Sequence, residues 1–195
     1  MADFADIEKK VKKELNSERY RHTLGVTYTA ACLAMRYSYD VQKARLAGLL
    51  HDCAKCISNK KKISMCEKAK LGVTDFEKEH PFLLHAKLGA YLAKEVYDVE
   101  DETILSAIFW HTTGKPDMSM LDKIIYIADY IEPNRDKAPR LGEIRELAFV
   151  DLDQCLYEIM KDTVNYLELN PKAIDKTTME AYEYYRKELG KEDDE

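Results

Sequence analysis

His51 and Asp52 stand side by side at the end of an apolar run, residues 44–50, that is typical of a buried helix. Burying an imidazole next to a carboxylate costs free energy unless a partner or a metal ion neutralises them. The two oxygens of the Asp52 carboxylate could bridge two cations. The other residues of metal-binding type are His22, His85, His111 and Asp129. Together these six residues could complete two coordination shells and leave positions for water and phosphate, which is the equipment of metal-assisted phosphoester or phosphoanhydride hydrolysis.

Asp129 is the hardest of these residues to explain without a metal ion. It follows the apolar run 124–128, and a carboxylate in such a run needs a cation or several hydrogen-bond donors. Any one histidine, taken singly, is better interpreted as a hydrogen-bonded core or surface residue. The joint pattern, with ligand-type residues contributed by different helices, is typical of a metal site in the core of a helical bundle.

The elements that must position these side chains are helices. Apolar residues recur at spacings of three and four along most of the chain, and no stretch sustains the period-two alternation of a half-buried strand. The sequence therefore predicts an all-α, single-domain fold. The expected helices cover residues 4–15, 17–37, 41–51, 61–71, a short segment opening at 74, 82–97, 102–110, 119–132, 151–169 and 177–190.

Local signals set the expected helix starts. Asp40 is an N-cap for the helix that leads to His51. Residues 74–77 have the form of a capping box, and Pro81 keeps the helix they open short. Residues 119–122 and 177–180 are expected to cap the helices that follow them.

Glycine and proline set the expected helix ends. Gly72 is expected at the C′ position of 61–71, and Asn170-Pro171 is expected to end 151–169. In 17–37 we expect the buried positions to include Leu24, Ala31 and Met35.

Composition narrows the class of protein. The chain has 195 residues, of which 46% are hydrophobic and 34% are charged. This length fits one domain that is large enough to bury a hydrophobic core. The net charge of -6 argues against a nucleic-acid partner, which would require clustered lysine and arginine. No window approaches the ~18 apolar residues of a membrane helix, and the acidic start of the chain does not resemble a signal peptide. We expect a soluble cytoplasmic protein.

The five cysteines, an odd and scattered set, are expected to be free thiols in a reducing compartment. Cys53 and Cys56 match C-x-x-C, but no second Cys or His pair lies nearby and no βαβ pattern surrounds them. Zinc or redox chemistry at this pair is therefore the minor alternative.

The order His22, His51-Asp52, Asp129 is similar to the H…HD…D pattern of HD-domain metal-dependent phosphohydrolases. His85 and His111, between HD and the last Asp, match the additional ligands of the binuclear subclass. Longer stretches closely resemble the YqeK-type HD hydrolases, and they are RYRHTLGV at 19–26, HDCAK at 51–55, LHA at 84–86, WHTTG at 110–114 and IYIADYIEPNR at 125–135. The resemblance covers about residues 5 to 189.

This resemblance implies a symmetrical diadenosine tetraphosphate hydrolase that forms two ADP. It implies one HD-domain unit over residues 1–195, with an HD core at about 17–135 and C-terminal helices at about 139–190. It also implies a homodimer and a binuclear centre, with iron as the first expectation and manganese, nickel or zinc as alternatives.

Carried over by position, the resemblance assigns the metal ligands. One ion takes His22, His51, Asp52 and Asp129. The other takes Asp52 as the bridging ligand, together with His85 and His111. A metal-bound hydroxide would be the nucleophile.

Six residues are candidates for contacting phosphate, and they are Arg21, Lys55, Thr112, Thr113, Gly114 and Arg135. Lys55 lies one helical turn after Asp52 and is expected to stabilise charge on the reacting phosphate, which makes it a catalytic candidate with Asp52. For Arg21 and Arg135, a surface ion pair is an equal alternative to a phosphate clamp.

Two further polar residues are candidates for holding the metal ligands in position. Thr23 and Glu132 could orient metal ligands, which histidine ligands usually require. His80, which precedes Pro81, is not expected to bind metal.

Other function classes stay open. Within hydrolases, a nucleotidase or alarmone phosphatase is the nearest alternative. A di-iron HD oxygenase would use a compatible ligand set, and oxygen uptake distinguishes it. A non-catalytic nucleotide sensor is a minor alternative, because such modules tend to have eroded ligand sets and this one is complete.

Overall fold

The computed structural model describes residues 3–169 and 174–191. Within these ranges the chain is all-α, and no strand occurs there, which confirms the predicted fold class. The helices are α1 (Phe4–Glu14), α2 (Ser17–Arg36), α3 (Val41–Leu50), α4 (Asn59–Lys68), α5 (Asp75–Glu79), α6 (Leu84–Tyr97), α7 (Glu102–Trp110), α8 (Met120–Ile131), α9 (Leu141–Leu147), α10 (Leu152–Glu168) and α11 (Lys176–Glu188).

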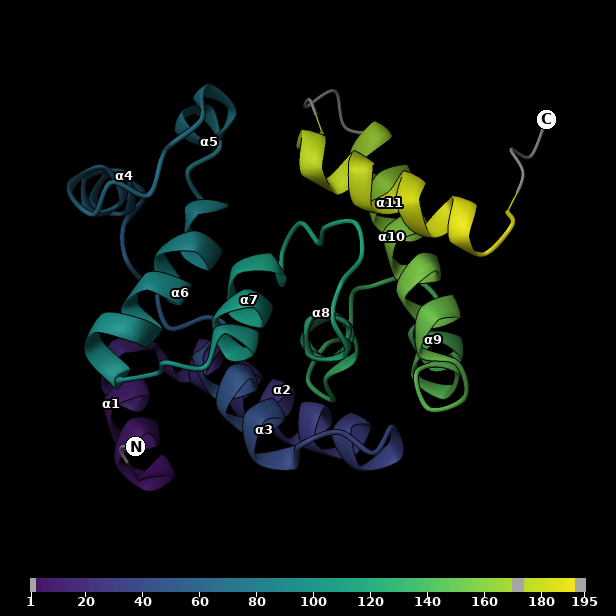
Figure 1. Ribbon diagram of the computed structural model, residues 1–195, viewed down its shortest axis with the longest axis horizontal. Coiled ribbons are helices and arrows are strands. Elements are labelled where there is room, and N and C mark those ends of the chain that lie inside the picture. Colours follow the sequence, from purple (N-terminus) through teal and green to yellow (C-terminus); the bar gives the residue numbers. More distant parts are fainter. Residues whose placement is uncertain (1–2, 170–173, 192–195) are drawn as a thin grey trace.

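Helix α8 is the centre of the molecule. Figure 1 shows it end-on, with α2 and α3 below it, α7 on one side and α10 on the other, and it packs on all four. Leu121, Ile124, Ile125 and Ile127 are completely buried. A helix that is apolar on most of its circumference must be enclosed by others, so α8 fixes the position of Asp129 in its last turn.

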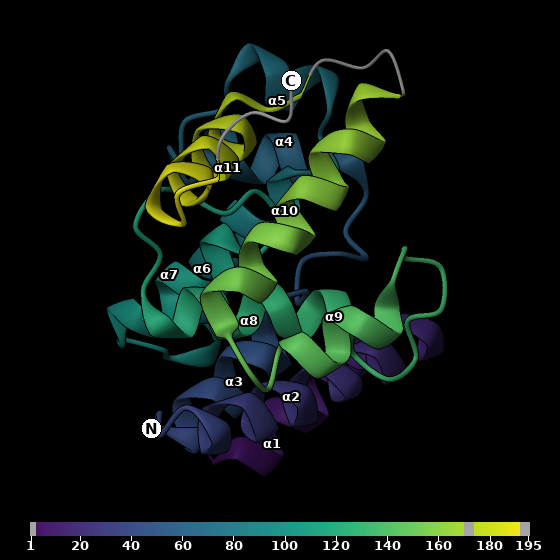
Figure 2. The same cartoon turned by 90° about the vertical axis from the view of Figure 1, so that its right-hand side faces the viewer.

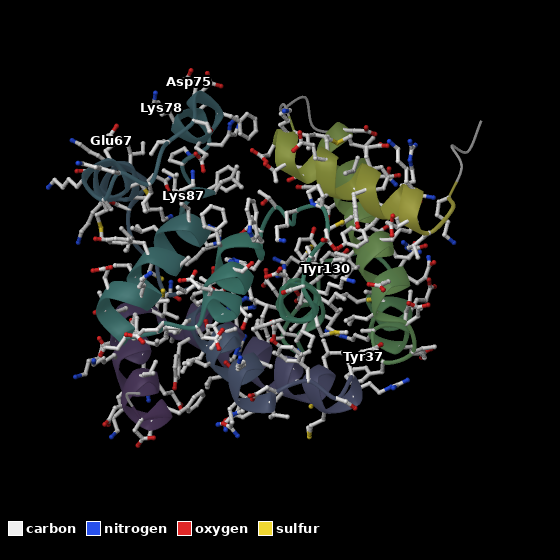
Figure 3. All side chains as sticks on the ribbon, in the orientation of Figure 1. Tyr37, Glu67, Asp75, Lys78, Lys87 and Tyr130 are labelled. Carbon is white, nitrogen blue, oxygen red and sulfur yellow. The ribbon has the colours of Figure 1, made fainter. Side chains whose placement is uncertain are left out.

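The remaining helices cover two ends of this core. Figures 1 and 2 both place α5 and α11 at the end of the molecule opposite α1, α2 and α3. Helix α4 packs on α6 through a small separate apolar cluster that contains Cys66, Leu84 and Leu88. At the other end, the Tyr37 hydroxyl donates to the carbonyl of Ala148 at 2.8 Å and joins the end of α2 to the α9–α10 corner (Figure 3).

Most predicted helix starts are confirmed. The Asp40 side chain accepts from the amides of the first turn of α3. Both capping boxes are present, at Thr74–Glu77 and at Ser119–Asp122. Helix α7 has the predicted bounds.

Two predictions about helix boundaries were wrong, and one helix was not predicted. Helix α4 ends at Lys68, and the left-handed residue that closes it is Lys70 (φ 54°), not Gly72. The amide of Leu71 donates to the carbonyl of Cys66, so the chain has already turned before Gly72. The last helix is capped by Asp175, whose side chain accepts from the amides of Thr177 and Thr178. Helix α9 was not predicted as a separate element, because it is short and Ile144 is its one buried residue.

The predicted burial in α2 is right at one of its three positions. Ala31 is buried, Leu24 is half-buried, and Met35 is 62% exposed. The predicted helix end at Asn170-Pro171 lies outside the described residues.

Two expectations from composition can be compared with the structure. The five cysteines are free thiols, and three of them, Cys53, Cys66 and Cys155, are buried. No helix in the described ranges is long and apolar enough to cross a membrane.

Candidate metal centre

The six predicted ligands meet where five helices end or begin. His51 and His111 are the C-cap residues of α3 and α7. His85 lies in the first turn of α6, and Asp129 in the last turn of α8. His22 is in the second turn of α2. Helix ends carry the imidazoles and carboxylates to one point while the apolar sides of the same helices form the core.

Three of the histidines have the same orientation. In His51, His85 and His111, Nδ1 lies 2.6–2.7 Å from the backbone carbonyl three residues earlier. A carbonyl only accepts, so Nδ1 carries the proton and donates. Each Nε2 is therefore left with a lone pair, which is the arrangement that metal-binding histidines adopt.

The fourth histidine is held by a carboxylate. Nδ1 of His22 lies 3.1 Å from Oε1 of Glu132, which is 1% exposed and serves as acceptor for its proton. The other oxygen of Glu132 accepts from the backbone amide and side-chain amide of Asn134, at 2.8 and 2.9 Å. This network fixes the ring and directs Nε2 of His22 toward Asp129.

The first group of ligands brings together atoms that can only accept. Nε2 of His22 is 3.0 Å from Oδ1 of Asp129, and Nε2 of His51 is 3.9 Å from the same oxygen. Both Nε2 atoms are buried and receive no hydrogen bond from the described residues. Two buried imidazole lone pairs without a donor are costly, and a cation between them and the Asp129 carboxylate would satisfy them.

The second group also brings acceptor atoms together, but here donors lie beside the two Nε2 atoms. Nε2 of His85 and Nε2 of His111 are 3.0 Å apart, and Oδ1 of Asp52 lies 3.2 and 3.7 Å from them. That carboxylate oxygen is also buried without a hydrogen bond from the described part of the chain. The hydroxyl of Thr112 lies 3.2 and 3.1 Å from the two Nε2 atoms.

Asp52 lies between the two groups. Its Oδ1 faces His85 and His111, whereas its Oδ2 lies 3.5 Å from Nε2 of His51 and 3.9 Å from Nε2 of His22. The side chain is 1% exposed. Burial alone would raise the pKa of Asp52, but the surrounding imidazoles of His51, His111 and His85 hold it well below its usual range. An ionised carboxylate with one oxygen toward each histidine pair has the geometry of a bridging ligand.

The protonation states of two further ligands, His85 and Asp129, also suit metal binding. Burial lowers the pKa of His85 to about 4, so its imidazole is neutral at neutral pH. Burial opposes ionisation of Asp129, yet the nearby side chains of His22, His51 and Arg135 lower its pKa far below the usual value. Neutral imidazole and ionised carboxylate are the forms that bind divalent metal ions.

Comparisons with known proteins agree with this geometry. A sequence model of the HD domain matches residues 19–134. The chain is 45% identical to the symmetrical bis(5'-nucleosyl)-tetraphosphatase of Bacillus subtilis, over 80% of this chain and 83% of the relative. This chain belongs to the HD-domain family, in its YqeK-type group. Proteins of the same name from Halalkalibacterium halodurans and Staphylococcus aureus are 41% and 37% identical, over 88% and 89% of this HD-domain chain and 91% and 90% of the relatives.

A solved HD-domain structure has the same fold. It is described as a predicted HD superfamily hydrolase involved in NAD metabolism from Clostridium acetobutylicum, and it superposes with a TM-score of 0.93 at 39% identity. The match covers 96% of this chain and 99% of that one.

Three candidate phosphate contacts lie at this HD-domain centre. Nζ of Lys55 is 3.0 Å from Nε2 of His85 and 3.6 Å from Oδ1 of Asp52. Arg135 donates to the backbone carbonyl of Asp129 at 2.8 Å and to its Oδ1 at 3.1 Å. Thr112 contacts the second histidine pair, as described above.

The other three candidates do not contact the ligands. Arg21 is exposed and lies at the rim of a cavity beside His22. The hydroxyl of Thr113 donates to the carbonyl of Gly114. Gly114 is buried with φ 66°, its amide donates to Trp110, and a Cβ there would contact Met160. Thr113 and Gly114 therefore make local contacts instead of contacts with the ligand cluster.

One functional candidate was missed by sequence reasoning. Nη1 of Arg19 donates to Oδ2 of Asp52 at 2.9 Å, and the side chain is 34% exposed. Arg19 is three residues before His22, which puts both on one face of α2. That spacing was the available signal, whereas Arg21, next to His22, lines the cavity beside His22.

Of the two residues expected to orient metal ligands, one contacts a ligand and the other does not. Glu132 contacts His22, but the buried hydroxyl of Thr23 makes no hydrogen bond within the described residues. His80 stacks on Phe76, with ring centroids 4.3 Å apart, and its Nδ1 bonds to the Phe76 carbonyl. It lies outside the ligand cluster.

A polar cavity of about 210 Å³, named here the His22 cavity, adjoins the centre at His22. It is lined by Glu18, Arg19, Arg21, His22, Glu132, Asn134, Arg135, Asp136 and Lys137. Its lining has four cationic and three acidic side chains, an excess of positive charge next to His22 that suits an anionic substrate.

Gly25 gives a test of the Glu132 contact. Gly25 lies one turn after His22, and a Cβ at this position would overlap Oε2 of Glu132. We expect Gly25→Ala to displace Glu132 from His22 and to weaken metal binding by about tenfold to a hundredfold. Titration of metal-free protein by calorimetry measures this. Gly142→Ala is the control, because a Cβ at Gly142 meets nothing within 4 Å; equal metal affinity in both variants would contradict the role given to Glu132.

Proposed function

We propose that this protein hydrolyses diadenosine tetraphosphate symmetrically to two ADP, using a binuclear metal centre held by the six converging residues. The observation that carries the proposal is Asp52, a buried carboxylate whose two oxygens face two separate histidine pairs. Relatives that are 37–45% identical over most of the chain carry the name symmetrical bis(5'-nucleosyl)-tetraphosphatase, which supports this substrate.

The proposed ligands form two sets. His22, His51, Asp52 and Asp129 would hold one ion, and Asp52, His85 and His111 would hold the other. Imidazole and carboxylate suit iron, and also manganese, nickel or zinc. When bound, such ions polarise phosphate oxygens and lower the pKa of coordinated water.

The remaining polar residues act on the substrate in this proposal. Lys55, at the edge of the second histidine pair, would stabilise the charge that develops on the reacting phosphate. Arg19, Arg21 and Arg135 surround the His22 cavity and would hold the phosphates on either side, because guanidinium groups bind phosphate oxygens with two parallel hydrogen bonds. The proposal also includes a cytoplasmic location and a homodimer.

Metal stoichiometry tests the binuclear part. Metal-free protein titrated with iron(II) or manganese(II) without oxygen should bind about two ions per chain, because six ligands are more than one open catalytic site requires. His111→Ala should reduce the number to about one, whereas His80→Ala should bind as the wild type does. Saturation of the wild type at one ion would contradict the binuclear centre.

A further inference from the structure

A second cavity adjoins the His22 cavity, and Arg135 and Lys137 line both. We name it the Tyr130 cavity; its volume is about 290 Å³. It is lined by Tyr130, Arg135, Lys137, Ala138, Pro139, Asp162, Thr163 and Tyr166. Mostly apolar and aromatic walls with a few polar groups, at about 300 Å³, are typical of a small-molecule site.

One polar atom of a residue that lines this cavity has no hydrogen-bond partner among the described residues. Oδ1 of Asp162 accepts from Nη2 of Arg140 at 2.8 Å, and Arg140 also pairs with Glu158 at 2.9 Å. Oδ2 of Asp162 is buried and receives no hydrogen bond from the described residues. A buried carboxylate oxygen without a donor is costly, so a ligand that supplies an N–H or O–H group would be stabilised here.

Arg135 connects the Tyr130 cavity to the candidate metal centre. Tyr130 follows the ligand Asp129 in α8, and Figure 3 shows it in the space between α8 and the C-terminal helices. Arg135, which lines the cavity, donates to the carbonyl and Oδ1 of Asp129. A phosphate chain that starts at the metal centre would pass the positive charges of Arg135 and Lys137 and bring its next group into this cavity.

We propose that the Tyr130 cavity binds one nucleoside of the substrate. This inference rests on the proposed function. Asp162 accepts a hydrogen bond from a ribose hydroxyl or from the amino group of the base. Tyr130 and Tyr166 provide aromatic surface for the base, since every base has a face that stacks. The side chain of Tyr166 is 66% exposed, so its ring is accessible to an incoming ligand.

The test compares the binding of ADP and inorganic pyrophosphate to the metal-loaded protein by calorimetry. Asp162→Asn keeps an oxygen for Arg140 but replaces the unpartnered oxygen with an amide that donates. We expect the Kd of ADP to rise about tenfold, because a hydrogen bond to a charged group is lost. The Kd of pyrophosphate should not change. Tyr166→Leu should weaken ADP binding several-fold in the same selective way.

Glu158→Gln is the matched control. It weakens the same Arg140 pairing, but Glu158 does not line the cavity, so both ligands should bind as they do to the wild type. An unchanged ADP affinity in Asp162→Asn, or equal weakening of pyrophosphate, would overturn the proposal. So would the same loss in Glu158→Gln, because the effect would then arise from Arg140.

Analogues identify the donor. The 2'-deoxy and 3'-deoxy forms of ADP lack one ribose hydroxyl each, and the purine riboside diphosphate lacks the amino group. The analogue that lacks the contacting donor should bind the wild type with the same affinity as ADP binds Asp162→Asn. The affinity of this analogue should not fall further when Asp162 is replaced by Asn. If all three bind like ADP, Asp162 accepts from none of these groups and the proposal is wrong. Because ADP binding is measured directly, a protein that binds ADP through Asp162 but does not cut diadenosine tetraphosphate would overturn the proposed function and not this inference.

Discussion

Asp52→Ala should abolish hydrolysis of diadenosine tetraphosphate, with a fall of at least about a thousandfold in kcat, and should lower metal content. Among the residues that the structure describes, Asp52 is the one whose oxygens face both histidine pairs, so its loss removes a ligand from each proposed site. It also leaves Arg19 without its 2.9 Å partner. Turnover with diadenosine tetraphosphate and elemental analysis of the same preparation measure the two effects.

His80→Ala is the control for this experiment. His80 stacks on Phe76 outside the ligand cluster, so the variant should keep both metal content and turnover. An Asp52→Ala protein that retains two ions, or a His80→Ala protein that loses them, would contradict the assignment of the bridging ligand.

Lys55→Ala should depress kcat by about a hundredfold, the usual loss when one electrostatic contact to a transition state is removed. Its ammonium lies 3.0 Å from Nε2 of His85 at the edge of the cluster and is one-third exposed, within reach of a bound phosphate. A cation there stabilises the charge that builds on the leaving oxygen more than it stabilises the ground state. Steady-state kinetics on diadenosine tetraphosphate measures the loss.

The metal affinity of this variant separates two roles for Lys55. Removing a positive charge beside His85 should leave metal binding equal to the wild type or tighter, because the ammonium competes with a metal ion for the same lone pair. Lys78→Ala is the control, since Lys78 pairs with Asp75 on the outside of α5 (Figure 3). Normal kinetics in Lys55→Ala would mean that Lys55 is a solvated surface residue without a role in catalysis. Loss of metal would mean that Lys55 maintains the structure of the site.

The sequence alone predicts the ligand cluster because its residues form one joint pattern in the order of the HD-domain family. A single histidine at a helix end is not informative, but Asp129 at the end of an apolar run needs a cation or several donors. Helix starts such as Asp40 are also predictable, because an N-cap depends on the few residues that follow it.

Contacts between distant segments could not be predicted in this way. Arg19 rather than Arg21 contacts Asp52 because helix phase, and not closeness to His22 in sequence, decides which side chain faces the cluster. Asp162 and Tyr130 come from different helices and meet only through the packing of α10 on α8. The end of α4 differs from prediction because Lys70 adopts the left-handed conformation, two residues before the available glycine.

The products of diadenosine tetraphosphate test the central claim most directly. Metal-loaded protein is incubated with the substrate, the products are separated by ion-exchange chromatography, and a chelator-treated sample is run beside it. We predict ADP as the only nucleotide product, two molecules per substrate, with no reaction after chelation and recovery when metal is restored. Formation of ATP and AMP, or hydrolysis that persists without metal, would contradict the account.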